Sequence, residues 1–135
     1  MKQNRIWRSL FVVYCGLMLV LLFHRAGYDQ LRSNLIPFHT IALYWKLLSR
    51  PVFRQSAIIN LVGNVVMFIP LGFLLPKVFS KQNRFYKVLL TTTAAITLVE
   101  LVQYVTLLGS CDIDDLILNV IGAAIGYGIY KKCLS

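Results

Sequence analysis

The chemistry of this chain is concentrated in very few acidic residues, because it holds only five in total. Three of them lie in the stretch SCDIDDLILN, immediately before an apolar run that continues almost to the C-terminus. Asp112, Asp115 and Asn119 are separated by steps of three and four, which places them on one face of a helix. Carboxylates in such a row could attract the cationic group of a ligand, or hold a cation.

Carboxylate and amide side chains repeat this spacing elsewhere in the chain. Glu100 and Gln103 are three residues apart, and Asn60 and Asn64 are four apart. Hydrogen bonds between helices are the alternative to a ligand site, because amides and carboxylic acids also join helices in this way. We predict one ligand-binding pocket, formed by Asn60, Asn64, Glu100, Gln103, Asp112, Asp115 and Asn119.

Asp114 lies off this polar face. It is turned by about 100° from Asp115, so we expect its side chain to face the water around the lipid headgroups. A carboxylate at the start of a helix also interacts favourably with the helix dipole, and any one of the three aspartates would suffice for that. Its replacement by Asn is therefore predicted to be nearly silent.

Catalysis and metal binding are alternatives to a binding pocket. Two close carboxylates could divide general acid and base roles, but no Ser or Cys stands at an obvious spacing from a His. A metal site would need His24 or His39 to fold onto Asp112 and Asp115. The three cysteines form no CxxC motif and predict neither a disulfide framework nor a zinc site. We predict no metal; the residues specify no cofactor.

The composition indicates an integral membrane protein. The chain of 135 residues is 58% hydrophobic and only 14% charged, whereas soluble domains carry about 25% charged residues. The net charge of +9 could suggest nucleic acid, but the Lys and Arg residues stand between apolar runs instead of along one face. Membrane lipids are therefore the expected partners, and nucleic acid is not.

The apolar runs predict an all-α, four-helix membrane bundle forming a single domain over residues 1–135. The first run is expected to be an uncleaved anchor, because no cleavage motif follows it. Residues 35–48 are short for a span and rich in aromatic side chains, so they predict an interfacial or re-entrant helix, with a fifth span as the alternative. The predicted spans are about 6–23, 56–75, 88–108 and 113–130.

The positive charges predict that both termini are cytoplasmic. With four spans, nine Lys and Arg residues fall on the side of the termini and five on the other, and a fifth span would reverse this bias. In this topology the acidic stretch faces outward. Glu100 then lies about 12 Å below the outer end of its span. Asn60 and Asn64 lie in the outer half of the second span, and Asn119 lies just below the outer end of the fourth. Three spans therefore place polar residues in the outer half of the bilayer.

Several stretches together resemble the VanZ family of small bacterial membrane proteins. They are NLVGNVVMFIPLGFLLP (60–76), ELVQ (100–103), DIDDLILNVIGAAIG (112–126) and the outer-loop pattern NLIPFHTI (34–41). Many family members carry an arginine shortly before the first Asp of the acidic motif. Here that stretch reads Gly109-Ser110-Cys111, so no role of that arginine carries over.

The resemblance implies a place in the bacterial cytoplasmic membrane and an association with resistance to teicoplanin and related lipoglycopeptides. The candidate ligands of the predicted pocket are then a lipoglycopeptide antibiotic or a lipid-linked cell-wall component. A membrane-embedded hydrolase or transferase acting on a lipid-linked envelope substrate is the enzyme alternative. A structural partner of an envelope complex, docking through Gly122-x-x-x-Gly126, is a third. The sequence leaves the oligomeric state open.

Overall fold

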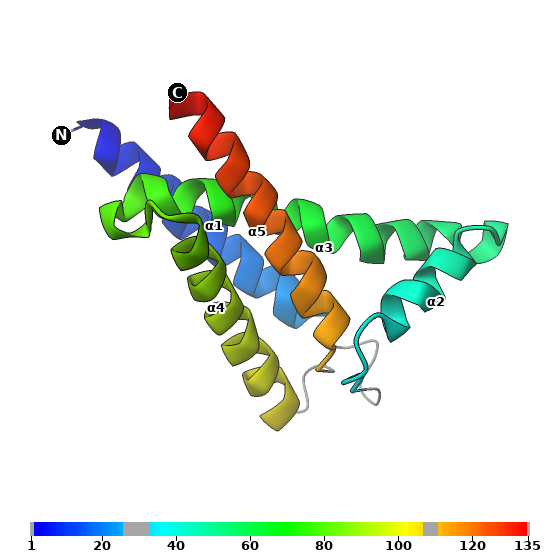
Figure 1. Ribbon diagram of the computed structural model, residues 1–135. Helices are drawn as coiled ribbons and strands as arrows, with labels where there is room; N and C mark the ends of the chain where they lie inside the picture. The colour runs from blue at the N-terminus through cyan, green and yellow to red at the C-terminus, as the bar shows by residue number, and fades with distance from the viewer. Residues whose placement is uncertain (1, 26–32, 107–110, 135) are drawn as a thin grey trace.

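The computed structural model describes residues 2–25, 33–106 and 111–134 as an all-helical bundle (Figure 1). Four helices are long and apolar enough to cross a membrane: α1 (Lys2–Arg25), α3 (Pro51–Val78), α4 (Phe85–Val105) and α5 (Ile113–Leu134). A short helix, α2 (His39–Leu47), precedes α3, and a 3-10 turn, η1 (Ser80–Gln82), precedes α4. The predicted four-span fold is therefore confirmed.

The segment between the first two spans contains the predicted extra helix, and its described residues contain no fifth span. Helix α2 has nine residues, which extend over only about 14 Å. A span needs roughly twice that length. The fifth-span alternative is wrong for this reason, and α2 instead packs against α3 and the start of α5.

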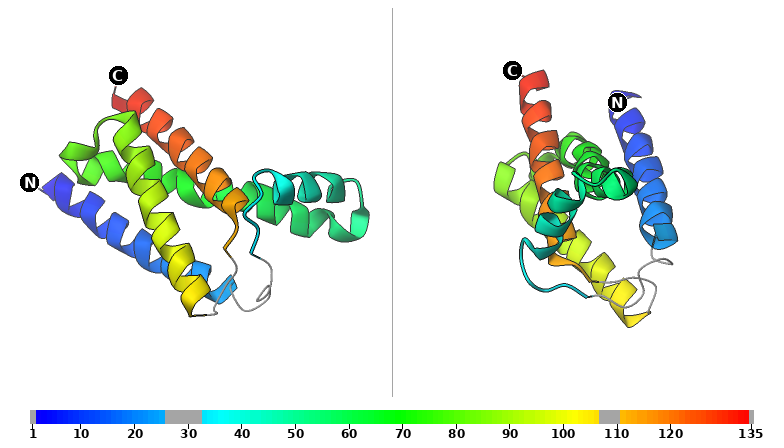
Figure 2. Two further views of the ribbon diagram at one scale, coloured as in Figure 1. Left: turned by 60° about the horizontal axis from the view of Figure 1, so that its bottom comes forward. Right: turned by 90° about the vertical axis from the view of Figure 1, so that its right-hand side faces the viewer.

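The helix boundaries differ from the predicted spans mainly in α3. This helix begins at Pro51, five residues before the predicted start, because proline suits the first turn of a helix. Its 28 residues extend about 42 Å, and the first half of α3 projects from the bundle together with α2 (Figures 1 and 2). The predicted end of the third span, Leu108, lies outside the described residues; α4 ends at Val105.

Small residues allow α3 and α5 to cross at close range. A Cβ at Gly122 would collide with the carbonyl of Val65, and one at Gly126 would collide with that of Ile69. The Gly122-x-x-x-Gly126 motif therefore packs within the chain, and the predicted use of this motif as a docking face for a partner is wrong. Gly128 has no atom within 4 Å of such a Cβ and takes no part in the crossing.

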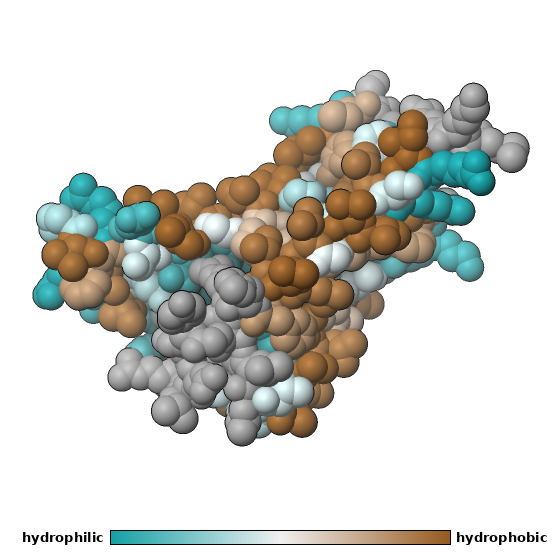
Figure 3. Space-filling model, turned by 180° about the vertical axis from the view of Figure 1, so that it is seen from behind, coloured by the Kyte–Doolittle hydropathy of each residue, from teal (hydrophilic) through white to brown (hydrophobic). Residues whose placement is uncertain are grey.

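The outer surface of the bundle suits lipid. Helix α1 exposes large apolar side chains, with Val12 at 68% and Val20 at 67% of their full accessible area. Figure 3 shows a continuous hydrophobic surface on one face, with hydrophilic atoms gathered at its two far ends. Both termini lie at the same end of the bundle, as an even number of spans requires (Figures 1 and 2).

Candidate functional site

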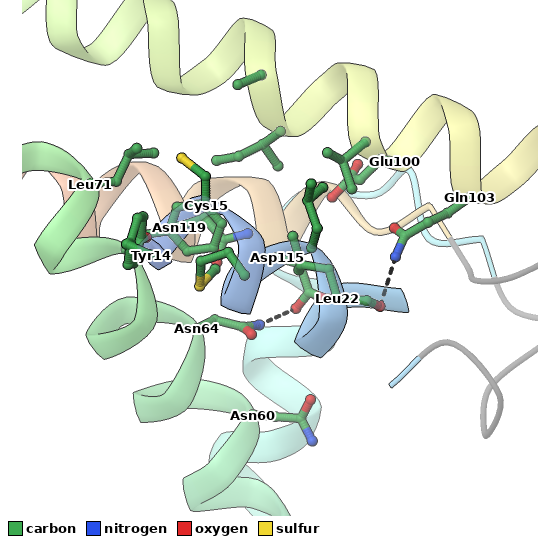
Figure 4. A pocket seen from close by; sticks show the side chains of 16 residues that line it. Tyr14, Cys15, Leu22, Asn60, Asn64, Leu71, Glu100, Gln103, Asp115 and Asn119 are labelled. Atoms are coloured by element: carbon green, nitrogen blue, oxygen red, sulfur yellow. Dashed lines mark hydrogen bonds between the residues drawn. The ribbon is translucent and has the colours of Figure 1, made fainter. Parts of the chain in front are cut away.

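A cavity of about 310 Å³ lies between the four long helices, away from the end that carries the termini. Its walls are largely apolar, with Met18 from α1, Phe68 and Leu71 from α3, and Ile96 from α4. Tyr14 also lines it. The carboxylate and amide side chains of the lining come from the first half of α3, the last turns of α4 and the first turns of α5, and Leu22 lies among them (Figure 4).

Six of the seven residues predicted to form a pocket line this cavity. Each comes from the helix expected from its spacing: two from α3, two from α4 and two from α5. Asp112 does not line it. The six are Asn60, Asn64, Glu100, Gln103, Asp115 and Asn119.

Hydrogen bonds hold several of these side chains in place. The Asn64 amide donates to Asp115 Oδ1 at 2.6 Å, which joins α3 to α5. The Gln103 amide donates to the carbonyl of Leu22 at 3.0 Å, which joins α4 to α1 (Figure 4). These bonds fix the helices around the cavity, so part of the interhelical role that the sequence left open is present in the structure.

Two acceptor groups in the lining are satisfied less well. Glu100 accepts a hydrogen bond from the Cys111 thiol at 3.5 Å, and a thiol is a weak donor. Asn119 is only 4% exposed, and its Oδ1 is buried with no hydrogen-bond partner. Buried oxygens are usually paired, so Asn119 Oδ1 is an exception; Glu100 is the acceptor that the lining offers to a ligand.

Asp112 has a structural role beside the cavity. Its Oδ1 accepts the backbone N–H of Asp114 at 2.9 Å, so it caps the N-terminus of α5. The same oxygen accepts from the Asn34 amide at 3.1 Å, and Oδ2 accepts from the Thr40 hydroxyl at 2.7 Å. Both partners belong to the segment that leads into α2 or to its first turn, so Asp112 joins two parts of the chain.

The expectation that Asp114 faces water is wrong. Its side chain is completely buried. Oδ1 accepts the N–H of Phe38 at 2.6 Å, and Oδ2 accepts those of Thr40 at 2.7 Å and Ile41 at 3.0 Å. The first N–H groups of a helix have no partner within it. Asp114 therefore caps α2 from another helix, a role that a helical face drawn on α5 alone could not reveal.

Backbone bonds support this connection. The N–H of Asn34 donates to the carbonyl of Cys111 at 2.9 Å, and the N–H of Ile113 donates to the carbonyl of Asn34 at 3.0 Å. Residues 34 and 112 thus form a parallel bridge. Phe38, which precedes α2, has φ at 65°, and its N–H is one of those that Asp114 accepts. The outer-loop pattern that resembled the VanZ family is therefore fixed by the acidic motif.

The predicted metal alternative finds no support in the described residues. No group of three or more His, Cys, Asp or Glu side chains within them is arranged to hold a metal ion. The side chain of His39 is exposed at the first turn of α2 and does not fold onto Asp115. The side chain of His24 lies outside the described residues.

Comparison with known proteins places the sequence in one family. A model of the VanZ/LLP1 family matches residues 11–134. The curated Protein VanZ of Enterococcus faecium is 28% identical over 125 residues, which cover 93% of this chain and 65% of that protein. The chain thus spans slightly less than two thirds of the length of this relative. No solved structure matches.

Proposed function

Because the chain belongs to the VanZ/LLP1 family, we propose that it lowers susceptibility to teicoplanin and related lipoglycopeptides by binding an amphiphilic ligand in its interhelical cavity. The observation that carries this proposal is the composition of the lining. Carboxylate and amide groups stand at one part of the cavity, and Met18, Phe68 and Leu71 form apolar walls at another. Such a cavity suits a molecule with a polar group and a hydrocarbon chain.

The site acts at the outer face of the bacterial cytoplasmic membrane in this proposal. The cavity is lined by the last turns of α4 and the first turns of α5, at the end of the bundle away from the termini, and the nine-to-five distribution of positive charge favours cytoplasmic termini. Lipoglycopeptides and lipid-linked cell-wall components are both encountered on the outer side. A cavity in the outer half of the bilayer is accessible to either.

Binding fits the lining better than catalysis does. No His is present among the described residues that line the cavity, so Cys15 has no neighbouring base there to activate it. The Asn64 and Gln103 amides bond to neighbouring helices. A hydrolase or transferase would need a positioned nucleophile. The described thiol–carboxylate contact, from Cys111 to Glu100, is long at 3.5 Å, and Cys111 does not line the cavity.

Filling the cavity tests this function. Ala95 lines the cavity and its neighbour Ala94 does not, although both side chains are exposed. The minimal inhibitory concentration of teicoplanin is measured in a susceptible host that expresses each variant, with membrane abundance checked by immunoblot. We expect Ala95→Phe to lose protection and Ala94→Phe to keep it. Equal protection by both variants at equal abundance would show that the cavity is not the functional site.

The carboxylates of the lining provide the second arm of the same test. We expect Glu100→Gln and Asp115→Asn each to abolish protection at normal abundance, because each removes the charge while keeping the size of the side chain. Full protection by both variants would show that the polar part of the cavity plays no part in resistance.

A further inference from the structure

A second hollow, a groove of about 430 Å³, lies between α1 and α3, and α5 contributes one residue to it. Its lining is almost entirely apolar. Leu10, Val13 and Leu17 form much of its α1 side, and all three side chains are exposed, so the groove is open to the surroundings of the bundle. The Tyr14 hydroxyl donates to the carbonyl of Met67 at 2.8 Å, which joins the two helices. The groove is therefore formed by helices already held together.

The length of the groove matches one leaflet of a bilayer. Along α1 its lining extends from Trp7 to Leu17, ten residues further along the chain, or about 15 Å. The hydrocarbon core of a bilayer is about 30 Å thick, so one leaflet contributes about half of that. Helix α1 begins at the end of the bundle that carries both termini (Figures 1 and 2), and Trp is favoured near the headgroups. The groove thus follows the leaflet on the side of the termini.

Lys77 stands beside the headgroup end of this groove. It follows Phe73 by about one turn of α3, toward the end of the bundle that carries the termini. Its Nζ lies 5.1 Å from the ring centroid of Trp7 and 5.9 Å from that of Phe73, and both of these rings line the groove. A third ring, that of Tyr130, lies 5.9 Å away. Aromatic faces attract an ammonium group, so the rings hold this charge at the groove, with the side chain still partly exposed.

No acidic residue is present in the segments that form this end of the bundle. Nine Lys and Arg residues fall on the side of the termini. The chain's five acidic residues are numbers 29, 100, 112, 114 and 115, and the segments 1–20, 70–95 and 120–135 contain none. The aromatic rings carry no negative charge, so they do not balance the charge of Lys77. A lipid phosphate, which lies at the depth of the headgroups, is the anion that the surroundings supply.

We propose that this groove binds an anionic phospholipid of the leaflet on the side of the termini, with one acyl chain along the apolar lining and the phosphate paired with the Lys77 ammonium. Charge complementarity selects this occupant. A second copy inserted in the same orientation would bring another positively charged end to the same level, and a choline lipid would bring a cation together with its phosphate. The inference goes beyond the proposed function, whose cavity lies at the opposite end of the bundle.

The fluorescence of Trp7 reports on this site directly. The chain has two tryptophans, and the other, Trp45, is 70% exposed in α2. The variant Trp45→Phe therefore leaves Trp7 as the single tryptophan. This protein is reconstituted in phosphatidylcholine vesicles that contain phosphatidylglycerol or phosphatidylcholine with a nitroxide quencher near the headgroup end of one acyl chain. We expect phosphatidylglycerol to bind about fivefold more tightly, the contribution of one Lys beside anionic lipid.

Charge variants in the Trp45→Phe background assign this selectivity to one residue. Lys77→Gln is expected to bring the affinity for phosphatidylglycerol close to that for phosphatidylcholine, and Lys77→Arg is expected to keep the selectivity. Lys81→Gln is the matched control, because it removes the same charge from an exposed position in η1 outside the groove. It should keep the selectivity. Each affinity is expressed relative to phosphatidylcholine in the same variant, so a change in the fluorescence of Trp7 itself cancels.

A second pair of variants tests the groove. The side chains of Val12 and Val13 are both exposed on α1, but only Val13 lines the groove. We expect Val13→Phe to obstruct the acyl chain and lose the preferential quenching by labelled phosphatidylglycerol. Val12→Phe, which adds the same ring outside the groove, should keep it.

Four results would overturn the inference. Equal affinity for the two lipids would remove the charge preference, and equal losses in Lys77→Gln and Lys81→Gln would show an attraction spread over the whole end of the bundle. Unchanged selectivity in Val13→Phe would exclude the groove. Weak quenching by both labelled lipids would show that protein, such as a second copy, covers it. None of these results affects the proposed function, which is tested by Ala95→Phe at the other cavity.

Discussion

Replacing Asp114 by Asn should release α2 from α5. The carboxylate accepts three backbone N–H groups at 2.6, 2.7 and 3.0 Å. An amide keeps one oxygen and turns its NH2 group toward at least one of these donors, which then loses its partner. One unpaired buried donor costs about 1–3 kcal/mol, and two bonds reduced from charged to neutral strength lose about 1 kcal/mol each. The connection should weaken by about 3–5 kcal/mol.

This loss should be local, because none of the nine residues of α2 is buried and few side-chain contacts oppose its opening. Hydrogen exchange measured by mass spectrometry on peptides covering Phe38 to Leu47 detects it. We expect exchange at Thr40 and Ile41 to be about a hundredfold to a few thousandfold faster in Asp114→Asn. Glu100→Gln, the same chemical change inside the cavity, is the control and should leave these amides unchanged. Unaltered exchange in a correctly inserted Asp114→Asn protein would refute the capping role.

Three further predictions concern packing, the cavity and topology. Gly126→Leu should separate α3 from α5 and lower the apparent melting temperature. Gly128→Leu should leave the melting temperature unchanged, because a Cβ at Gly128 has no neighbouring atom within 4 Å. Asn64→Leu removes the 2.6 Å bond to α5 and should impair teicoplanin protection without preventing insertion; normal protection would remove this residue from the site. Burial, and next a nearby carboxylate charge, raise the pKa of the Cys111 thiol. Its thiolate fraction at neutral pH is therefore reduced, so labelling by an impermeant maleimide in intact cells should be slow and should accelerate with rising pH. Cys133 should resist the reagent throughout, and rapid labelling of Cys133 alone would reverse the proposed topology.

The sequence predicted the four spans well because their apolar runs are long and separated by charged segments. It also predicted which side chains of α3, α4 and α5 surround the cavity, because polar residues repeat at helical spacing within those runs. Helix α1 was missed as part of the lining. Tyr14 and Cys15 lie in a run without any polar periodicity, so nothing in their spacing distinguishes the cavity side from the lipid side.

The sequence could not predict where Asp112 and Asp114 bond, for a different reason. Helical periodicity describes one helix at a time, but the partners of Asp114 in α2 are 73 to 76 residues away along the chain. The contact depends on how the segment before α2 folds against the start of α5. The resemblance marked the Asn34–Ile41 stretch as part of the family pattern, and this was the one signal that pointed to it.

The first turn of α5 explains why three carboxylates stand together in a chain that has only five. Successive residues of a helix point about 100° apart, so a short acidic stretch at a helix start can serve several directions at once. Asp112 caps its own helix, Asp114 caps α2, and Asp115 bonds to Asn64 at the cavity. A single capping residue would stabilise α5 equally well but would leave α2 unattached. Because one rigid turn carries both the attachment of α2 and a wall of the cavity, a displacement of that turn moves both together.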